Sequence, residues 1–346
     1  MRLTSLALIG ATLTLAGCLA TSGGPKATVA VPMPAGSADA ARIRSVAVLP
    51  FEGDYNRELT TDIEGLLTSI RLGETSYFNV VERKALDTVL KEIRLSQSGI
   101  VNKEQGLRLG KLLGIKAYYT GTVTSPAYHQ NYYQESRSQC AEEDSKKGFL
   151  GGKKCKRWVE TKISCSKSEA VFSFTPKLVE IESGRIIYSE NIKGTATASA
   201  CPDQTTPAPS ESQLKRAAKE NALAAFRKDV APSFATIDIP LMDSTDTVSN
   251  DQAKRKLLQG LEFAKGNRLD RACELWQEAS ELGASSPSIL YNLGVCAETA
   301  GNFQRAGELY RKADRLLDKP DERVSSALAR MDRGRRQQAR FGEQIR

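Results

Sequence analysis

The sequence predicts two folds in one chain: a mixed α/β domain over residues 42–242 and an all-α domain after it. Short apolar runs, typical of buried strands, alternate with segments of helical period between residues 44 and 123, which favours an α/β layer. Beyond residue 253 the pattern is helical and repeats every 34 residues. A third observation, an apolar leader that ends in a cysteine, indicates the compartment.

The leader is predicted to be a signal peptide over residues 1–17. Arg2 precedes an uncharged apolar run that is shorter than the ~20 residues of a membrane-spanning helix and typical of secretory signals. The run ends in Leu15, Ala16 and Gly17 before Cys18, which resembles the bacterial lipoprotein signal, where the cysteine is acylated. The next residue is leucine, whereas an aspartate there favours the inner membrane. We therefore expect a protein that is lipid-anchored at Cys18 on the periplasmic face of the outer membrane.

Residues 18–41 are rich in Ala, Pro, Gly, Ser and Thr, so we expect a lipidated, flexible tether. No later segment has 18 consecutive apolar residues, which predicts that the chain contacts the membrane through its lipid and not through a helix. The net charge is +8. In the periplasm this charge favours anionic lipid, peptidoglycan or an acidic partner, and no nucleic acid is expected as a ligand.

The first elements of the α/β domain follow from apolar spacing. Residues 44–50 are largely apolar and end at a proline, as a buried strand does. Within 57–72, apolar residues recur at i, i+3, i+4 and i+7, which is one face of a helix. The same patterns predict a strand over 78–83, helices around 86–93 and 107–114, and a strand over 115–123.

Longer strands are predicted next. Residues 157–181 and 185–200 flank the turn 182–184, whose glycine suits a positive φ. The polar loop 201–212 leads to a helix that ends at Pro232. Residues 243–252 are a polar linker that closes the domain.

The second domain resembles two tetratricopeptide repeats over residues 253–320, followed by a basic capping helix over 321–346. Residues of the same type recur 34 apart: Gly260 and Gly294, Ala272 and Ala306, Trp276 and Tyr310, Ala279 and Ala313. Small alanines let two antiparallel helices approach closely, and one large aromatic residue fills the gap between them. The resemblance implies a concave face that binds other envelope proteins, with Tyr291, Val295 and Glu298 on it.

Cysteine pairing follows from the compartment. Six cysteines remain after Cys18, an even number in an oxidising space, which indicates disulfides. If Ile181 faces Arg185 across the turn, opposed residues in the ladder keep a constant sum, and Cys165 then faces Cys201 at bonding distance. This pairing leaves Cys140 and Cys155 to close the lysine-rich insert 130–168. Further along the chain, Cys273 and Cys296 form either a disulfide or two buried thiols.

The residue types argue against catalysis. The single histidine, His129, excludes most acid–base triads and histidine metal sites. The cysteines lack the close pairs of a zinc site, and no glycine-rich phosphate loop joins a strand to a helix. We therefore expect no enzyme, no metal and no cofactor. Glu82 and Arg83, at a strand-to-helix junction, are either a surface ion pair or a subunit contact.

The α/β domain resembles the curli secretion and holdfast-anchoring lipoprotein family (CsgG/HfaB-like). The matching stretches are "SVAVLPFEG", "YFNVVERKALDTVLKEIRLSQSGIV", "LGKLLGIKAYYTGTVT" and "VFSFTPKLVEIESGRIIYSENIKG", in the family's order over roughly 44–240. The resemblance implies a mixed sheet with helices, attachment to the outer membrane, and a homo-oligomer such as a ring. Channel-forming members add two membrane-crossing hairpins per subunit.

Neither hairpin position has the apolar alternation that a membrane-crossing strand needs. The first position coincides with the basic insert 130–168, and the second, near 195–212, is polar. We therefore expect a scaffold or accessory factor that binds proteins during secretion or assembly of envelope components. The alternatives are a subunit of an oligomeric export channel and an activator of a peptidoglycan synthase. The partner, the exported substrate and the subunit number do not follow from the sequence.

Overall fold

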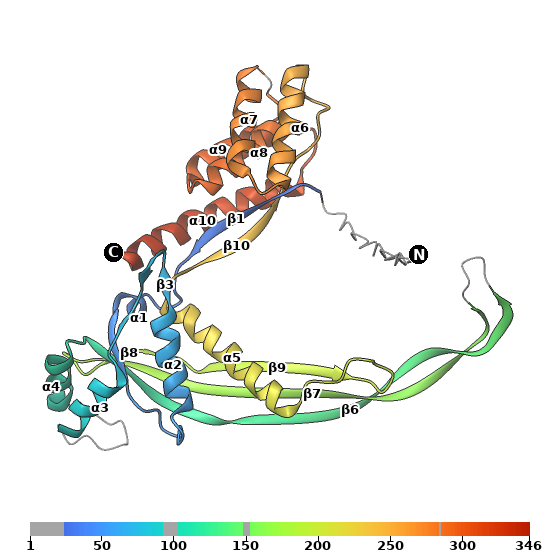
Figure 1. Ribbon diagram of the computed structural model, residues 1–346. Helices are drawn as coiled ribbons and strands as arrows, with labels where there is room; N and C mark the ends of the chain where they lie inside the picture. The colour runs from blue at the N-terminus through green and yellow to red at the C-terminus, as the bar shows by residue number, and fades with distance from the viewer. Residues whose placement is uncertain (1–23, 93–102, 148–152, 284) are drawn as a thin grey trace, which may run out of the picture. The chain divides into compact units, whose positions relative to one another are not determined.

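The computed structural model describes residues 24–92, 103–147, 153–283 and 285–346 (Figure 1). The chain divides into two compact units. The α/β unit comprises Pro32–Ala235 and Arg336–Arg346, and the helical unit comprises the chain up to Val31 with Thr236–Arg335. The predicted α/β fold and the predicted helical fold are both present.

The α/β unit is built on a six-stranded mixed sheet in which β5, β2, β6, β7 and β8 are neighbours in that order and β9 also pairs with β7. Parallel pairing joins β2 to β5 and β6, and antiparallel pairing joins β7 to β6, β8 and β9. The strands are β2 (Ser45–Val48), β5 (Asn79–Val80), β6 (Ala117–Lys147), β7 (Lys153–Glu180), β8 (Ile186–Ser189) and β9 (Ile192–Ala200). A separate short pair consists of β3 (Arg71–Leu72) and β4 (Thr75–Ser76).

Helices cover both faces of this sheet. They are α1 (Ala38–Arg42), α2 (Glu58–Ser69), α3 (Arg83–Glu92), α4 (Lys103–Leu113) and α5 (Glu211–Val230). Alternate residues of β2 enter two separate cores: Val46 packs with residues of α2 and α5, and Ala47 packs with residues of α3 and α4. Each of the strands and helices predicted between residues 44 and 123, and the helix predicted after the loop 201–212, has its counterpart here.

Helix α5 lies unusually close to β9. A Cβ atom on Gly194 would stand 2.1 Å from the carbonyl oxygen of Ala218, so only glycine fits at this point of the strand. The Phe226 ring of α5 then packs edge-on against Tyr119 and Phe174 of the sheet, at centroid distances of 5.6 and 5.8 Å. This packing fixes the base of β6 and β7.

Strands β6 and β7 continue far beyond this core as one antiparallel hairpin (Figure 1). Their pairing extends from Ala117 opposite Glu180 to Lys147 opposite Lys153, with irregularities after Thr124 and after Cys140. In the insert 130–168 the expected Cys140–Cys155 disulfide and the strand expected from residue 157 are both present, but the strand over residues 130–147 was not predicted. The omission has a physical cause: residues 130–147 lack the apolar alternation by which a strand is recognised.

The helical unit contains most of a two-stranded sheet and of a helical array, and its boundaries with the α/β unit fall within β1, β10 and α10. The strands are β1 (Lys26–Met33) and β10 (Ser233–Pro240), and the helices are α6 (Asp251–Lys265), α7 (Leu269–Glu281), α8 (Pro287–Thr299), α9 (Phe303–Asp314) and α10 (Glu322–Ile345). The expectation of a flexible tether over 18–41 fails where that stretch is described. Ala27 and Val29 alternate with exposed residues, are buried and belong to the core of the helical unit, while Ala38–Arg42 forms α1.

The two helical hairpins, α6–α7 and α8–α9, repeat the same contact. A Cβ atom on Gly260 would lie 2.3 Å from Trp276 Nε1, and one on Gly294 would lie 2.5 Å from Tyr310 Cε1. Glycine therefore makes room for an aromatic ring at two places that are 34 residues apart, which matches the predicted period. Among the described helices, none combines the length and hydrophobicity needed to span a bilayer.

Candidate functional site

The described cysteines form three disulfides. They join Cys140 to Cys155, Cys165 to Cys201, and Cys273 to Cys296, with Cα–Cα distances of 5.6, 4.3 and 5.8 Å. Of the two alternatives for the last pair, the structure therefore has the disulfide. Cys18, the predicted lipidation site, lies outside the described residues.

The predicted Cys165–Cys201 pairing is confirmed, but the uninterrupted register from the turn, on which the prediction rested, is not. Phe174 lies opposite Ile192 and Ser166 opposite Ala200, so that Cys165 and Cys201 follow as the next pair along the ladder. One local shift occurs beside the turn, where Val179 faces Ile186. This irregularity moves the pairing by one residue, and β9 continues the register that follows it, in which Cys165 faces Cys201.

The predicted partner-binding residues Tyr291, Val295 and Glu298 are not on an open face. Each is at most 3% exposed, which corrects the expectation that they contact a partner. Glu298 accepts hydrogen bonds from Arg330 Nε at 2.5 Å and Nη2 at 2.9 Å, and from the Tyr310 hydroxyl at 2.7 Å. Helix α10 thus covers this side of α8 with a buried ion pair.

The chain itself also occupies the rest of the predicted groove. The side-chain amide of Asn292 accepts from the Met242 N–H at 3.0 Å and donates to the Met242 carbonyl at 2.9 Å. The Ser288 hydroxyl donates to the Ser244 carbonyl at 2.7 Å. Side chains of α8 therefore hold the backbone of an extended segment that follows β10, in the position that we expected a partner to take.

Burial shifts the acid–base properties of this cluster. It raises the pKa of Tyr291 to about 12 and raises that of Tyr310, because a phenolate would be poorly solvated there. Burial alone would lower the pKa of Arg330, but hydrogen bonds and charge attraction from Glu298 outweigh it and raise that pKa. Both tyrosines consequently stay protonated through the physiological range, and the cluster acts as a fixed structural link.

No metal centre is found in the part of the chain that the structure describes. The one grouping of ligand-type residues there is Glu135 with Cys165 and Cys201, and both sulfurs are bonded to each other. His129 is exposed on β6, in the register opposite Glu169. This arrangement offers no acid–base pair in a cleft.

Arg83, one candidate for a subunit contact, is engaged within its own unit. Its Nε atom lies 3.5 Å from Glu64 Oε2, and its Nη1 donates to Thr61 Oγ1 at 2.9 Å. Burial raises the pKa of Glu64, although the charge of Arg83 opposes this. The residue therefore attaches α3 to α2 through an ion pair, although its partner is Glu64 and not its sequence neighbour Glu82.

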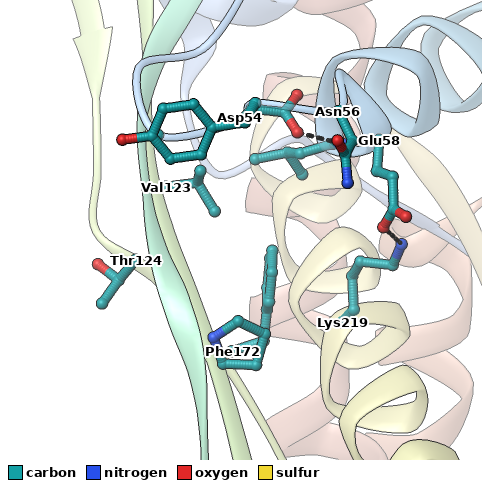
Figure 2. Close-up of a pocket in the computed structure, with 11 residues that line it drawn as sticks. Asp54, Asn56, Glu58, Val123, Thr124, Phe172 and Lys219 are labelled. Atoms are coloured by element: carbon teal, nitrogen blue, oxygen red, sulfur yellow. Dashed lines mark hydrogen bonds and ion pairs between the residues drawn. The ribbon is translucent and has the colours of Figure 1, made fainter.

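Sequence reasoning missed a pocket of about 240 Å³ beside the loop between β2 and α2 (Figure 2). The backbone turns at Gly53 and Arg57, both of which have positive φ. Asp54 fixes the loop, since its carboxylate accepts from the N–H groups of Leu59 and Thr60, at 3.2 and 2.8 Å. This leaves Tyr55 at the pocket rim, 96% exposed.

The pocket has an apolar floor and a polar rim. Phe172 and Val123 contribute to the floor, while Asn56, Glu58 and Lys219 lie along the rim (Figure 2). The Lys219 ammonium lies 2.8 Å from Asp62 and 3.7 Å from Glu58; burial acts to lower its pKa, but these carboxylates prevail and raise it. Because its charges are already paired, the pocket suits an inserted apolar side chain and not proton transfer.

Comparison with known sequences decides the family. The family described as "Curli production assembly/transport component CsgG" matches residues 26–204, more than half of the chain. The chain belongs to the CsgG family. The match begins at β1 and ends before α5, so the helices α6–α10 lie outside the part that defines this CsgG family member.

Solved structures with likeness to this CsgG-family chain are distant. The LpoB C-terminal domain from Salmonella enterica shares 13% identity, covers 46% of this chain and 83% of its own, and has a TM-score of 0.25. A PelC dodecamer from Paraburkholderia phytofirmans shares 13%, with coverages of 59% and 98% and a TM-score of 0.24. Lipoprotein GNA1162 from Neisseria meningitidis shares 16%, with coverages of 47% and 87% and a TM-score of 0.21. The comparison with curated proteins gave no match.

Proposed function

We propose that this chain is an outer-membrane lipoprotein of the periplasmic face that acts as a scaffold or accessory factor in secretion or assembly of envelope components. The observation that carries the proposal is the CsgG-family match over residues 26–204, since that family is described as an assembly and transport component. In this proposal the chain is not an enzyme and binds its partners as proteins. A lipid on Cys18 anchors it to the membrane.

The disulfides support this placement. Three disulfides in one chain favour an oxidising compartment, as the periplasm is. We assign the helical array to the tetratricopeptide class on its 34-residue period and on the paired contacts of Gly260 with Trp276 and Gly294 with Tyr310. Its groove is filled by the chain itself, so in this proposal the array holds the fold together and partners bind elsewhere.

The pocket beside Tyr55 is the partner site that we propose. A protein–protein contact is commonly centred on an aromatic anchor, and Tyr55 is 96% exposed beside a cavity of about 240 Å³. A partner that inserts an apolar side chain over Phe172 would cover this tyrosine. The fixed loop, which Asp54 holds, would lose little conformational entropy on binding.

An accessory role fits the distal hairpin better than a membrane-crossing role does. Glu135 and Arg137 lie on one face of the ribbon, whereas Glu160 and Lys162 lie on the other. A lysine or arginine that faces lipid near the midplane costs on the order of 2–4 kcal/mol, and neither face lacks charge. We therefore place an export channel second to a scaffold.

The test is site-specific crosslinking in cells. A photoreactive amino acid in place of Tyr55 should give a discrete crosslinked band whose partner mass spectrometry identifies as an envelope assembly protein. The matched control places the same amino acid at Phe263, which is 40% exposed in the helical unit, and should not give that band.

Other outcomes would change the proposal. A peptidoglycan synthase as the crosslinked protein would favour the activator role. Steady ion conductance of the purified chain in planar bilayers, together with a ring-shaped oligomer by sedimentation, would favour the channel. The absence of any crosslink at Tyr55 that differs from the control would refute the pocket as a partner site.

A further inference from the structure

The two disulfides of the β6–β7 hairpin lie in different surroundings. Cys165 is fully buried and Cys201 is 8% exposed, so little of either residue contacts solvent. In the other bridge, which we call the tip disulfide, Cys140 is exposed and Cys155 is half-buried. Thiol–disulfide exchange requires direct attack of a thiolate on a sulfur atom, so access favours reaction at the tip disulfide.

Charge protects the buried disulfide further. The Glu135 carboxylate lies 3.6 Å from Cys165 Sγ and 3.5 Å from Cys201 Sγ, where it repels an approaching thiolate. Arg137 Nη2 lies 3.9 Å from Cys201 Sγ, but this guanidinium also pairs with Glu135 and Asp203. The three charged groups together have one surplus negative charge, which disfavours a thiolate at this bridge.

No such carboxylate contact is found at the tip disulfide within the described part of the chain. Each of its sulfurs lies 3.2 Å from a backbone carbonyl oxygen, Cys140 from that of Glu142 and Cys155 from that of Arg157. Glu142 has Arg157 opposite it in the ladder, which offsets its charge. Cys155 also follows Lys154 directly in sequence, and cations near a cysteine stabilise the thiolate that forms when the bond breaks.

The register at the tip disulfide is irregular. Cys140 lies opposite Trp158 and Cys155 lies opposite Glu143, so the two bonded cysteines belong to different rungs of the ladder. The register moves by one residue after Cys140 and moves back after Glu142. The pairing of Glu143 with Cys155 is therefore the one that an uninterrupted ladder, continued from Cys140, would also have.

A regular ladder could not hold this disulfide. In an uninterrupted register, Cys140 and Cys155 would be three rungs apart, or about 10 Å along the strands. Side chains alternate between the two faces, so this odd number of rungs would also place the two sulfurs on opposite sides of the ribbon. Cysteines with Cα atoms more than about 7 Å apart cannot be bridged. The irregularity brings these Cα atoms to 5.6 Å, so the bond and the irregularity require each other.

We propose that the tip disulfide is a site of reversible thiol–disulfide exchange with a dithiol protein, and that the exchange sets the shape of the hairpin tip. A thiolate of the dithiol bonds to one of the two sulfurs, the Cys140–Cys155 bond breaks, and the released sulfur takes up a proton. The second thiol of the dithiol then displaces the first, which leaves two thiols on this chain and a disulfide on the co-reactant. Without the bond, the strands regain a regular register and lose the local bend that bulges impose. The proposal does not depend on the partner site at Tyr55.

Reduction of the purified mature chain by dithiothreitol tests the exchange. Samples taken over time at neutral pH, without denaturant, are alkylated and mapped by mass spectrometry. The tip cysteines should be alkylated at least about tenfold faster than Cys165 and Cys201. Glu135→Gln should narrow this gap by speeding reduction of the buried disulfide. The matched control is Glu160→Gln, which removes an exposed carboxylate on the other face of the ribbon and should leave the gap unchanged. Equal thermal unfolding midpoints of both variants ensure that faster reduction does not reflect lost folding.

Amide hydrogen exchange tests the change of shape. The double variant Cys140→Ser with Cys155→Ser represents the reduced state. In a regular ladder more amides of residues 140–143 and 155–158 donate to the opposite strand, so these segments should exchange more slowly in the variant than in the disulfide-bonded chain. As the control, Cys273→Ser with Cys296→Ser removes the disulfide of the helical unit and should leave exchange in both segments unchanged.

Two results would overturn the proposal. Equal rates of alkylation at the two hairpin disulfides would show that access and charge do not distinguish them. Unchanged or faster exchange of residues 140–143 and 155–158 in the serine variant would show that the bond does not hold the strands out of their regular register.

Discussion

The buried ion pair between Glu298 and Arg330 provides the sharpest test of the helical unit. The Glu298 side chain is fully buried, and that of Arg330 is 20% exposed. Replacing Glu298 by leucine removes three hydrogen-bond acceptor contacts, those with the two Arg330 nitrogens and with the Tyr310 hydroxyl. The guanidinium then stays in a largely buried position without its counter-charge.

We expect Glu298→Leu to lower the free energy of unfolding of the helical unit by about 3–5 kcal/mol. This is the usual cost of removing one partner of a buried ion pair and leaving the other charge without compensation. For a unit of this size, 1 kcal/mol shifts the melting temperature by about 4–8 °C, so the variant should melt at least about 12 °C lower. The double variant Glu298→Leu with Arg330→Met removes both charges. It should recover most of the loss, because an apolar pair of similar volume replaces the ion pair.

The assay is equilibrium unfolding in urea followed by the fluorescence of Trp276, which is buried in this unit. A Trp158→Phe background removes the signal of the α/β unit. As the control, Glu262→Gln breaks an exposed pair with Lys265 and should change stability by less than about 1 kcal/mol. The reasoning is refuted if Glu298→Leu costs no more than this control, or if the double variant is less stable than the single one.

Three further outcomes are expected. Gly294→Ala should cost about 1–3 kcal/mol by urea unfolding, because its Cβ atom would meet the ring of Tyr310 at 2.5 Å; an unchanged midpoint would contradict the close approach. Removing the Cys165–Cys201 disulfide by a double alanine variant should cost about 3–4 kcal/mol, whereas removing the disulfide near the hairpin tip should leave the melting temperature of the core unchanged; equal effects would contradict this. Burial raises the pKa of Tyr291 to about 12, so its contribution to stability is complete below pH 10 and is lost as the pH rises toward 12. Between pH 10 and 12, Tyr291→Phe should therefore reduce the slope of the free energy of unfolding against pH by about 1.4 kcal/mol per pH unit. A slope equal to that of the unchanged chain would exclude this role of Tyr291.

Local rules predicted the register of the β7–β9 ladder well. The three-residue turn ending in Gly184 and a strict two-residue period placed Cys165 opposite Cys201, and that pair is bonded. The pairing beside the turn is one residue out of this register, and an irregularity in β8 restores it. The 34-residue period likewise anticipated two equivalent helical hairpins, in which Gly260 and Gly294 make the same contact with an aromatic ring. In both cases neighbours along the chain determine the contact.

Features that depend on distant segments were missed. Residues 130–147 have no apolar alternation, so the β6 half of the distal hairpin shows only when its pairing with β7 is considered. The groove residues Tyr291 and Glu298 follow the pattern of an open helical face, but the sequence does not reveal that α10 and the residues after β10 cover them. The pocket at Tyr55 depends on Phe172 and Lys219, which lie far along the chain.

The position of strand β1 limits how far the fold can lie from the proposed lipid anchor. Its start is fixed to the helical unit, where the Leu241 N–H donates to the Pro25 carbonyl at 2.7 Å. In the proposed lipoprotein only residues 19–25 separate the acylated cysteine from this point, and seven residues reach at most about 24 Å when fully extended. The helical unit would therefore work within that radius of the bilayer surface, confined to a thin layer of the periplasm where partners that span or coat the outer membrane are concentrated.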